Sequence, residues 1–188
     1  RIFNFYRARD FRPAWFNEHG LAEQTGEVVN LITDYLDAGV VDSSVFLKGI
    51  GALYDTLSAE DFSVRSNVSR VLAADVLFTG QFFAFSDKAW RGKYAGSQKD
   101  LAWFIPAKKF SEEAYLDSLL RMKPTDIRGS EPVFAHYHAL RNKLRELVQI
   151  RRQGGWNTLD VPETMPLFGD SSEFVASLRK RLALSEGA

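Results

Sequence analysis

The chain has 188 residues, of which 24 are Lys or Arg and 24 are Asp or Glu, so its formal net charge is zero. That length fits one domain, or one domain with an appendage, and 45% hydrophobic with 26% charged residues is an ordinary globular composition. The charge balance argues against a nucleic-acid binder, which usually carries a basic excess. The chain contains no cysteine, which excludes disulfides, thiolate metal sites and a cysteine nucleophile within these residues.

The first forty residues combine an aromatic opening with a helical pattern. Residues 1–16 are rich in Phe, Tyr and Trp, and residues 17–20 have the composition of a turn. Apolar residues then recur at helical spacing over residues 21–38, and Gly39 is a natural residue to follow a helix.

Two further helices are predicted before residue 91. The first begins at Ser43 or Ser44 as its N-cap and runs to about Leu57. The second covers residues 64–90 and is apolar around so much of its circumference that we expect it in the middle of a bundle. Its most apolar stretch, residues 76–85, is about half as long as a membrane span requires, so we expect no membrane crossing.

The second half continues as helices and irregular connections. Residues 91–110 are irregular, apart from a short strand over residues 101–105. Ser111 caps a helix that runs to about residue 122, with acidic residues in its first turn. A long helix is predicted over residues 131–153.

After the long helix, Gly154 and Gly155 end the helical pattern, residues 156–169 are extended, and residues 171–184 form a last amphipathic helix. We therefore predict a mainly α protein, a multi-helix bundle with irregular loops and at most a short strand.

The long helix carries one apolar seam and one basic face. We expect the seam to pack inward and Trp156 to close the bundle behind it, although an exposed indole could instead stack on a sugar ring. The basic side chains could contact an anionic polymer or simply be solvated. The seam consists of Val133, Tyr137, Leu140, Leu144 and Leu147, and the basic face includes Arg141, Arg145, Arg151 and Arg152.

Asp75 interrupts the apolar stripe of the 64–90 helix, so it must be paired or protonated if it is buried. We favour a structural ion pair with Arg7, Arg9 or Arg12 over a role as a catalytic acid, because no second carboxylate lies at a useful helical spacing.

Other catalytic and ligand-binding patterns are absent from the sequence. His136 and His138 are two residues apart and point to different helix faces, so they are not a metal-binding pair, and His19 fits local turn structure. The sequence has no nucleophile elbow and no glycine-rich phosphate loop. We therefore predict no catalytic residue, no metal and no cofactor.

Several segments, taken in order, resemble the scaffold domain of YcbB-like L,D-transpeptidases. Residues 6–15 match an opening of the form Y-x-x-R-x-x-x-P-x-W, and residues 75–79 match D-x-x-[LF]-T. Residues 134–156, which end in Gly154-Gly155-Trp156, are similar to the family's long helix and its G-G-W exit. Residues 161–182 look like the start of the peptidoglycan-binding segment that follows, although that repeat is incomplete. The family's G-L-x-P-x-x-Y stretch is only loosely echoed at residues 39–46.

The resemblance implies a helical scaffold domain over residues 1–160 and the opening of a peptidoglycan-binding-like region over residues 161–188. The family's catalytic domain lies further downstream and carries an S-H-G-C-x-R motif, which this chain lacks. The fragment is thus expected to be non-catalytic, with the parent chain an L,D-transpeptidase of the periplasm or cell envelope. Any signal peptide or membrane anchor would lie upstream of Arg1.

The resemblance also suggests roles for particular residues. Asp75, Trp15, Trp156, Gly154 and Gly155 are expected to be structural. The partners of this chain would be the downstream catalytic domain and peptidoglycan. The candidate contacts to peptidoglycan are Arg141, Arg145, Arg151, Arg152 and Trp156. Two alternatives remain open at this point: a free-standing helical adaptor of the cell envelope, and an enzyme that uses Asp75 or a histidine.

Overall fold

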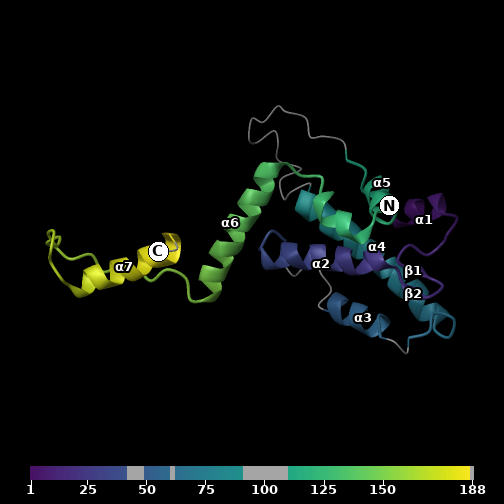
Figure 1. Ribbon diagram of the computed structural model, residues 1–188, viewed down its shortest axis with the longest axis horizontal. Helices are drawn as coiled ribbons and strands as arrows, with labels where there is room; N and C mark the ends of the chain where they lie inside the picture. The colour runs from purple at the N-terminus through teal and green to yellow at the C-terminus, as the bar shows by residue number, and fades with distance from the viewer. Residues whose placement is uncertain (42–48, 60–61, 91–109, 187–188) are drawn as a thin grey trace.

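The computed structural model describes residues 1–41, 49–59, 62–90 and 110–186, and confirms a mainly α protein (Figure 1). The only sheet in these ranges is a two-residue hairpin, in which Phe16 pairs with Leu21 across the predicted turn. The helices are α1 (Ile2–Ala8), α2 (Glu23–Asp37), α3 (Ile50–Leu57), α4 (Val68–Trp90), α5 (Glu112–Leu119), the 3-10 helix η1 (Pro124–Gly129), α6 (Ala135–Arg152) and α7 (Glu173–Glu186); the strands are β1 (Phe16–Asn17) and β2 (Gly20–Leu21).

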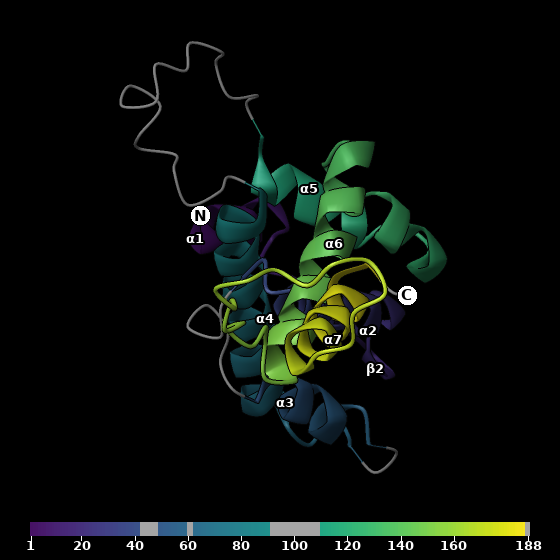
Figure 2. The same cartoon turned by 90° about the vertical axis from the view of Figure 1, so that its left-hand side faces the viewer.

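Helix α4 forms the centre of the bundle, as its apolar circumference predicts. It contacts α1, α2 and α5, and the rings of Phe78, Phe82 and Phe85 are almost fully buried. By length and composition α4 is also long and apolar enough to cross a membrane, a property that core helices of globular proteins share. Val68, Leu72 and Val76 on this helix are about half exposed. Figure 2 shows α4 running through the bundle, with α3 near one of its ends.

Helix α2 packs against η1 and α3, and Ile127 of η1 is completely buried there. Gly39 ends α2 with a φ of +73°, a conformation that favours glycine. A Cβ at Gly39 would lie 2.7 Å from Cγ2 of Val148, so the glycine also allows α6 to approach α2 closely.

Most predicted helix boundaries hold to within a few residues, but α3 begins at Ile50 with Gly49 as its N-cap, so the prediction that Ser43 or Ser44 caps this helix is wrong. Helix α4 begins at Val68 rather than residue 64, because residues 64–66 form a turn before it. The proposed caps Ser43 and Ser44, the strand at 101–105 and most of the irregular 91–110 stretch lie outside the described residues. The cap of α5 is confirmed, since Ser111 Oγ accepts a hydrogen bond from the Ala114 N–H at 3.2 Å.

The prediction that the apolar seam of α6 packs inward is right for Tyr137 and wrong for the three leucines. Tyr137 packs against the core, and its hydroxyl donates to the Ala89 carbonyl at 3.2 Å. Leu140 is 70% exposed, and Leu144 and Leu147 are also exposed. The face that meets the bundle also carries Arg141 and Val148, seven residues apart. The helix has this rotation because Arg141 reaches a buried carboxylate of the bundle, described below, and the leucines consequently face outward.

Beyond α6 the chain leaves the bundle, and α7 lies to one side of it (Figure 1). Gly154 and Gly155 both have positive φ and end α6, the arrangement expected of glycines after a helix. Trp156 is 38% exposed and lies outside the buried core cluster, so it is not the fully buried indole expected of a residue that closes the bundle. Arg181 of α7 donates to the Asn157 carbonyl at 2.6 Å, which ties α7 to the segment after α6.

Candidate functional site

A buried carboxylate joins α4 to the start of the chain. Asp75 is 2% exposed, and its oxygens accept hydrogen bonds from the backbone N–H groups of Ala14, at 2.9 and 3.1 Å, and Trp15, at 2.8 Å. The Tyr6 hydroxyl donates to Asp75 Oδ2 at 2.5 Å. Backbone donors of one segment and a phenol of another therefore compensate the desolvated carboxylate.

The same contact extends one turn along α4 to Thr79. The indole Nε1 of Trp15 donates to Thr79 Oγ1 at 2.9 Å, and this hydroxyl lies 2.8 Å from the oxygen of Tyr6. Burial and the bond to Asp75 raise the pKa of Tyr6 well above its ordinary value, so Tyr6 remains a donor at neutral pH. We call Tyr6, Trp15, Asp75 and Thr79 the Asp75 node.

The predicted ion pair between Asp75 and an arginine is wrong. Arg9 instead pairs with Asp117 at 2.7 Å, and the Arg7 guanidinium lies over the Phe3 ring, 5.9 Å from its centre. The backbone after α1 replaces the expected cation, because the turn following the helix directs two consecutive N–H groups at the carboxylate. The backbone N–H groups of Ala14 and Trp15 and the Tyr6 hydroxyl bind its oxygens, which gives Asp75 a structural role.

A second buried carboxylate holds α6 to the bundle. Arg141 binds Glu131 through two hydrogen bonds, at 2.6 and 3.1 Å, and its guanidinium lies 4.5 Å from the centre of the Tyr35 ring. The Tyr35 hydroxyl donates to Glu131 and accepts from Trp90 Nε1 at 3.0 Å. The Glu131 side chain is 3% exposed and that of Arg141 is 12% exposed, so Arg141 serves packing and is not a surface cation.

Among the remaining candidate peptidoglycan contacts, Arg145 and Arg152 are seven residues apart and share a face of α6. Arg145 donates to Asn142 at 3.2 Å, and Arg152 lies 3.6 Å from Asp37 of α2. Arg151 is exposed but projects about a quarter turn away from Arg152 on α6. Trp156 lies beyond the end of the helix and is partly exposed.

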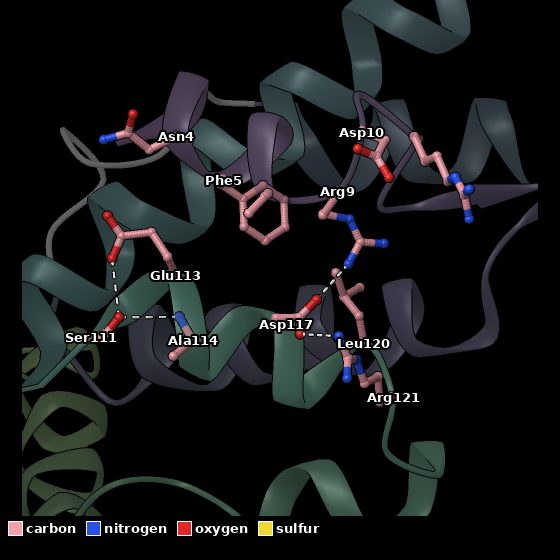
Figure 3. Close-up of a pocket in the computed structure, with 12 residues that line it drawn as sticks. Asn4, Phe5, Arg9, Asp10, Ser111, Glu113, Ala114, Asp117, Leu120 and Arg121 are labelled. Atoms are coloured by element: carbon pink, nitrogen blue, oxygen red, sulfur yellow. Dashed lines mark hydrogen bonds and ion pairs between the residues drawn. The ribbon is translucent and has the colours of Figure 1, made fainter.

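Sequence reasoning missed a cleft of about 720 Å³ between α1 and α5 (Figure 3). The Phe5 side chain lies in the middle of it, facing α5. Arg9 and Arg121 both bind Asp117 at one end, at 2.7 and 2.6 Å. Arg9, a charged residue of the opening motif, was one signal in the sequence that pointed to this cleft. Hydrophobic periodicity cannot show that two helices more than a hundred residues apart face each other.

The two ends of the cleft differ in charge. Arg9 and Arg121 lie at one end together with Asp10 and Asp117. Arg12 also lines the cleft, and its backbone N–H donates to the Arg9 carbonyl at 3.1 Å. Glu113 lies at the other end, where its carboxylate accepts a hydrogen bond from Ser111 Oγ at 3.3 Å, and Asn4 faces it from α1. The lining residues are Asn4, Phe5, Ala8, Arg9, Asp10, Arg12, Ser111, Glu113, Ala114, Asp117, Leu120 and Arg121.

The turn after α1 shapes the cationic end of this cleft. Asp10 and Phe11 have φ values of +52° and +57°, and the Phe11 N–H donates to the Tyr6 carbonyl at 2.8 Å to close the helix. The chain thus reverses direction, which places Arg12 against the cleft and Ala14 and Trp15 against Asp75.

The histidines and acidic residues form no metal site in the described part of the chain, where no three of them gather. His138 Nδ1 lies 3.3 Å from Arg141, and His19 lies in the turn of the hairpin, where its N–H donates to Asn17 at 2.8 Å.

Three carboxylates are buried in the described residues: Asp75, Glu131 and Glu112, the last paired with Arg1 at 2.9 Å. Together with the packing roles of the motif residues, they fit a structural module. Comparison with known families agrees, because the family described as Scaffold domain matches residues 1–144, well over half of the chain. The chain therefore belongs to the scaffold-domain family. No curated protein and no solved structure matches it significantly.

Proposed function

We propose that this chain is the non-catalytic scaffold module of a bacterial cell-wall L,D-transpeptidase, an enzyme that cross-links peptidoglycan. The Asp75 node is the observation that carries the proposal. The two segments that resemble this family, residues 6–15 and 75–79, are 60 residues apart between Trp15 and Asp75, and they meet through the node. Residues that define the resemblance are thus the ones that hold α1 and α4 together.

The node explains why a scaffold would need these residue types. An Asp on α4 has to accept from the backbone that follows α1, and the Thr one turn later has to accept from the indole of Trp15. Each residue of the pattern then has a packing or hydrogen-bonding role, and none is left over for catalysis.

The outward-facing leucines of α6 are the surface we assign to the downstream catalytic domain of the same chain. Leu140, Leu144 and Leu147 follow one another along the helix and remain exposed beside the bundle. An apolar stripe of this kind is typical of a surface that another domain covers. A periplasmic or cell-envelope location belongs to the same proposal.

The peptidoglycan contact in this proposal involves fewer residues than the sequence suggested. Arg141 is occupied by Glu131, so the contact would rest on Arg145, Arg151, Arg152 and Trp156. Replacing Trp156 with Ala tests it, because a sugar platform would be lost while folding would not. We expect weaker sedimentation with purified peptidoglycan at an unchanged melting temperature; unchanged sedimentation would contradict the contact.

The coding sequence that follows Ala188 tests the main proposal. We expect a downstream S-H-G-C-x-R motif and cross-linking of a disaccharide-tetrapeptide by the whole product. The present residues alone should not cross-link it, because they contain no thiol to activate. A stop codon after Ala188, or cross-linking by these residues alone, would contradict the proposal.

A free-standing helical adaptor of the cell envelope is the second candidate. The exposed leucine stripe favours it as much as it favours a downstream domain, because a separate partner could cover the same surface. The downstream coding sequence distinguishes the two candidates.

A further inference from the structure

We propose that the cleft between α1 and α5 binds a short peptide with a free amino terminus and a free carboxylate. The proposal does not depend on the transpeptidase context, because it rests on the charges, spacing and apolar centre of the cleft. The proposal adds a ligand-binding site to a chain in which the motif residues have packing roles.

The end of the cleft that holds the arginines would take the carboxylate. Three arginines face two aspartates there, which leaves one positive charge in excess. Asp117 already binds Arg9 and Arg121, and no hydrogen bond or ion pair within the described residues occupies Arg12. A guanidinium free to bind a carboxylate through two parallel hydrogen bonds is the usual recognition element for that group.

The opposite end would take the ammonium group. Glu113 accepts one hydrogen bond, from the Ser111 hydroxyl, which leaves acceptor capacity on its carboxylate, and its charge already acts on the Arg1 guanidinium. Asn4 offers a further polar side chain across the cleft. The partial charges at the ends of α1 and α5 oppose this orientation, but they are about half a charge each and decay within one turn.

The distance between the two ends selects the length of the ligand. Glu113 and Arg121 mark the two ends of the cleft and are eight residues apart, with Arg121 two residues beyond the end of α5. At 1.5 Å per residue this corresponds to about 12 Å. An extended peptide covers about 3.3–3.6 Å per residue, so three or four residues span the two ends. A volume of about 720 Å³ has room for a peptide of this size.

The centre of the cleft is apolar and suits small side chains. Phe5 faces α5 there, and Ala8 and Ala114 line the walls without adding bulk. Phe5 is 3% exposed and forms the floor of the cleft, so the body of the peptide would lie along Ala8 and Ala114, and the charges at the two ends would fix its direction.

Titration of the protein with tri-alanine tests the proposal, because this peptide carries only its two terminal charges at neutral pH. We expect saturable amide chemical-shift changes on α1 and α5. N-acetylation or C-amidation of the peptide should each weaken binding by about tenfold. Binding of the blocked peptides as tight as that of tri-alanine, or shifts confined to other elements, would overturn the proposal.

Two variants assign the ends of the peptide. Arg12→Gln should weaken binding of tri-alanine but not of its C-amide, and Glu113→Gln should weaken binding of tri-alanine but not of its N-acetyl form. Arg65→Gln, an exposed arginine away from the cleft, is the matched control and should bind as the wild type does. Wild-type melting temperatures of Arg12→Gln and Glu113→Gln show that folding is intact, and wild-type affinity of both variants would contradict the assignment.

Discussion

At the scale of single residues, Asp75 and Glu131, two of the three carboxylates that are buried in the described residues, are satisfied in different ways. Asp75 accepts from backbone N–H groups and a tyrosine, whereas Glu131 binds an arginine and a tyrosine. Both arrangements attach a helix to the core: the first attaches the chain around α1, and the second attaches α6. Loss of either carboxylate leaves buried donors without an acceptor, which costs more than the bond itself contributes.

Replacing Asp75 with Ala should destabilise the protein by about 3–5 kcal/mol, because the N–H groups of Ala14 and Trp15 and the Tyr6 hydroxyl lose their acceptor together. Urea denaturation measures this free energy of unfolding. Asp160→Ala, an exposed carboxylate, is the control and should change stability by less than about 0.5 kcal/mol. Equal stabilities of the two variants would show that Asp75 is not a structural carboxylate.

Replacing Arg141 with Ala should cost about 3 kcal/mol, since it leaves the carboxylate of Glu131 buried without its cation. Arg151→Ala removes an exposed arginine from the same helix and should change stability by less than about 0.5 kcal/mol. The urea denaturation midpoints of the two variants show whether the buried arginine contributes more to stability than the exposed one. A smaller loss for Arg141 than for Arg151 would contradict the placement of Arg141.

At the scale of elements, α6 is the helix whose orientation differs most from expectation. Its leucine spacing correctly indicates one apolar face, but spacing alone does not say what covers that face. The bundle offers the carboxylate of Glu131, and Arg141 rather than a leucine meets it. An apolar seam on a helix that carries an inward-facing arginine is therefore ambiguous in sequence.

The double variant Leu140→Gln, Leu144→Gln should cost less than about 1 kcal/mol, because both side chains are exposed and glutamine is a good helix former. Leu116→Ala, at a fully buried position of α5, should cost about 2–5 kcal/mol by comparison. Thermal melts of the two proteins provide the test. A large loss from the glutamine variant would mean that the seam packs inward after all.

At the scale of the whole molecule, the sequence predicts the helical architecture and the central place of α4, because hydrophobic periodicity reports burial directly. It also marks Asp75, since a carboxylate inside an apolar stripe requires a partner. The partner itself was not predictable, because backbone N–H groups of Ala14 and Trp15 leave no signature in side-chain identity. The cleft between α1 and α5 was equally hidden, because only tertiary packing brings Phe5 opposite Ala114.

The buried tyrosines make the fold sensitive to alkaline pH. Burial raises the pKa of Tyr115 to about 12, from 10.0, with a smaller contribution from Glu131. Between these values the unfolded chain has lost a proton that the folded chain retains, so stability should be intact below about pH 10 and should fall as the pH rises toward 12. Urea midpoints measured across this range should fall less steeply for Tyr115→Phe, and identical slopes would contradict the prediction.

The link between the two motif segments is the central claim, and a double-mutant cycle between Tyr6 and Asp75 measures it most directly. Tyr6→Phe, Asp75→Asn and the double variant should give unfolding free energies that are coupled by at least about 1 kcal/mol, because the hydroxyl of one residue donates to the carboxylate of the other. If the loss of stability in the double variant equals the sum of the two single losses to within about 0.5 kcal/mol, the two segments are not joined by this bond.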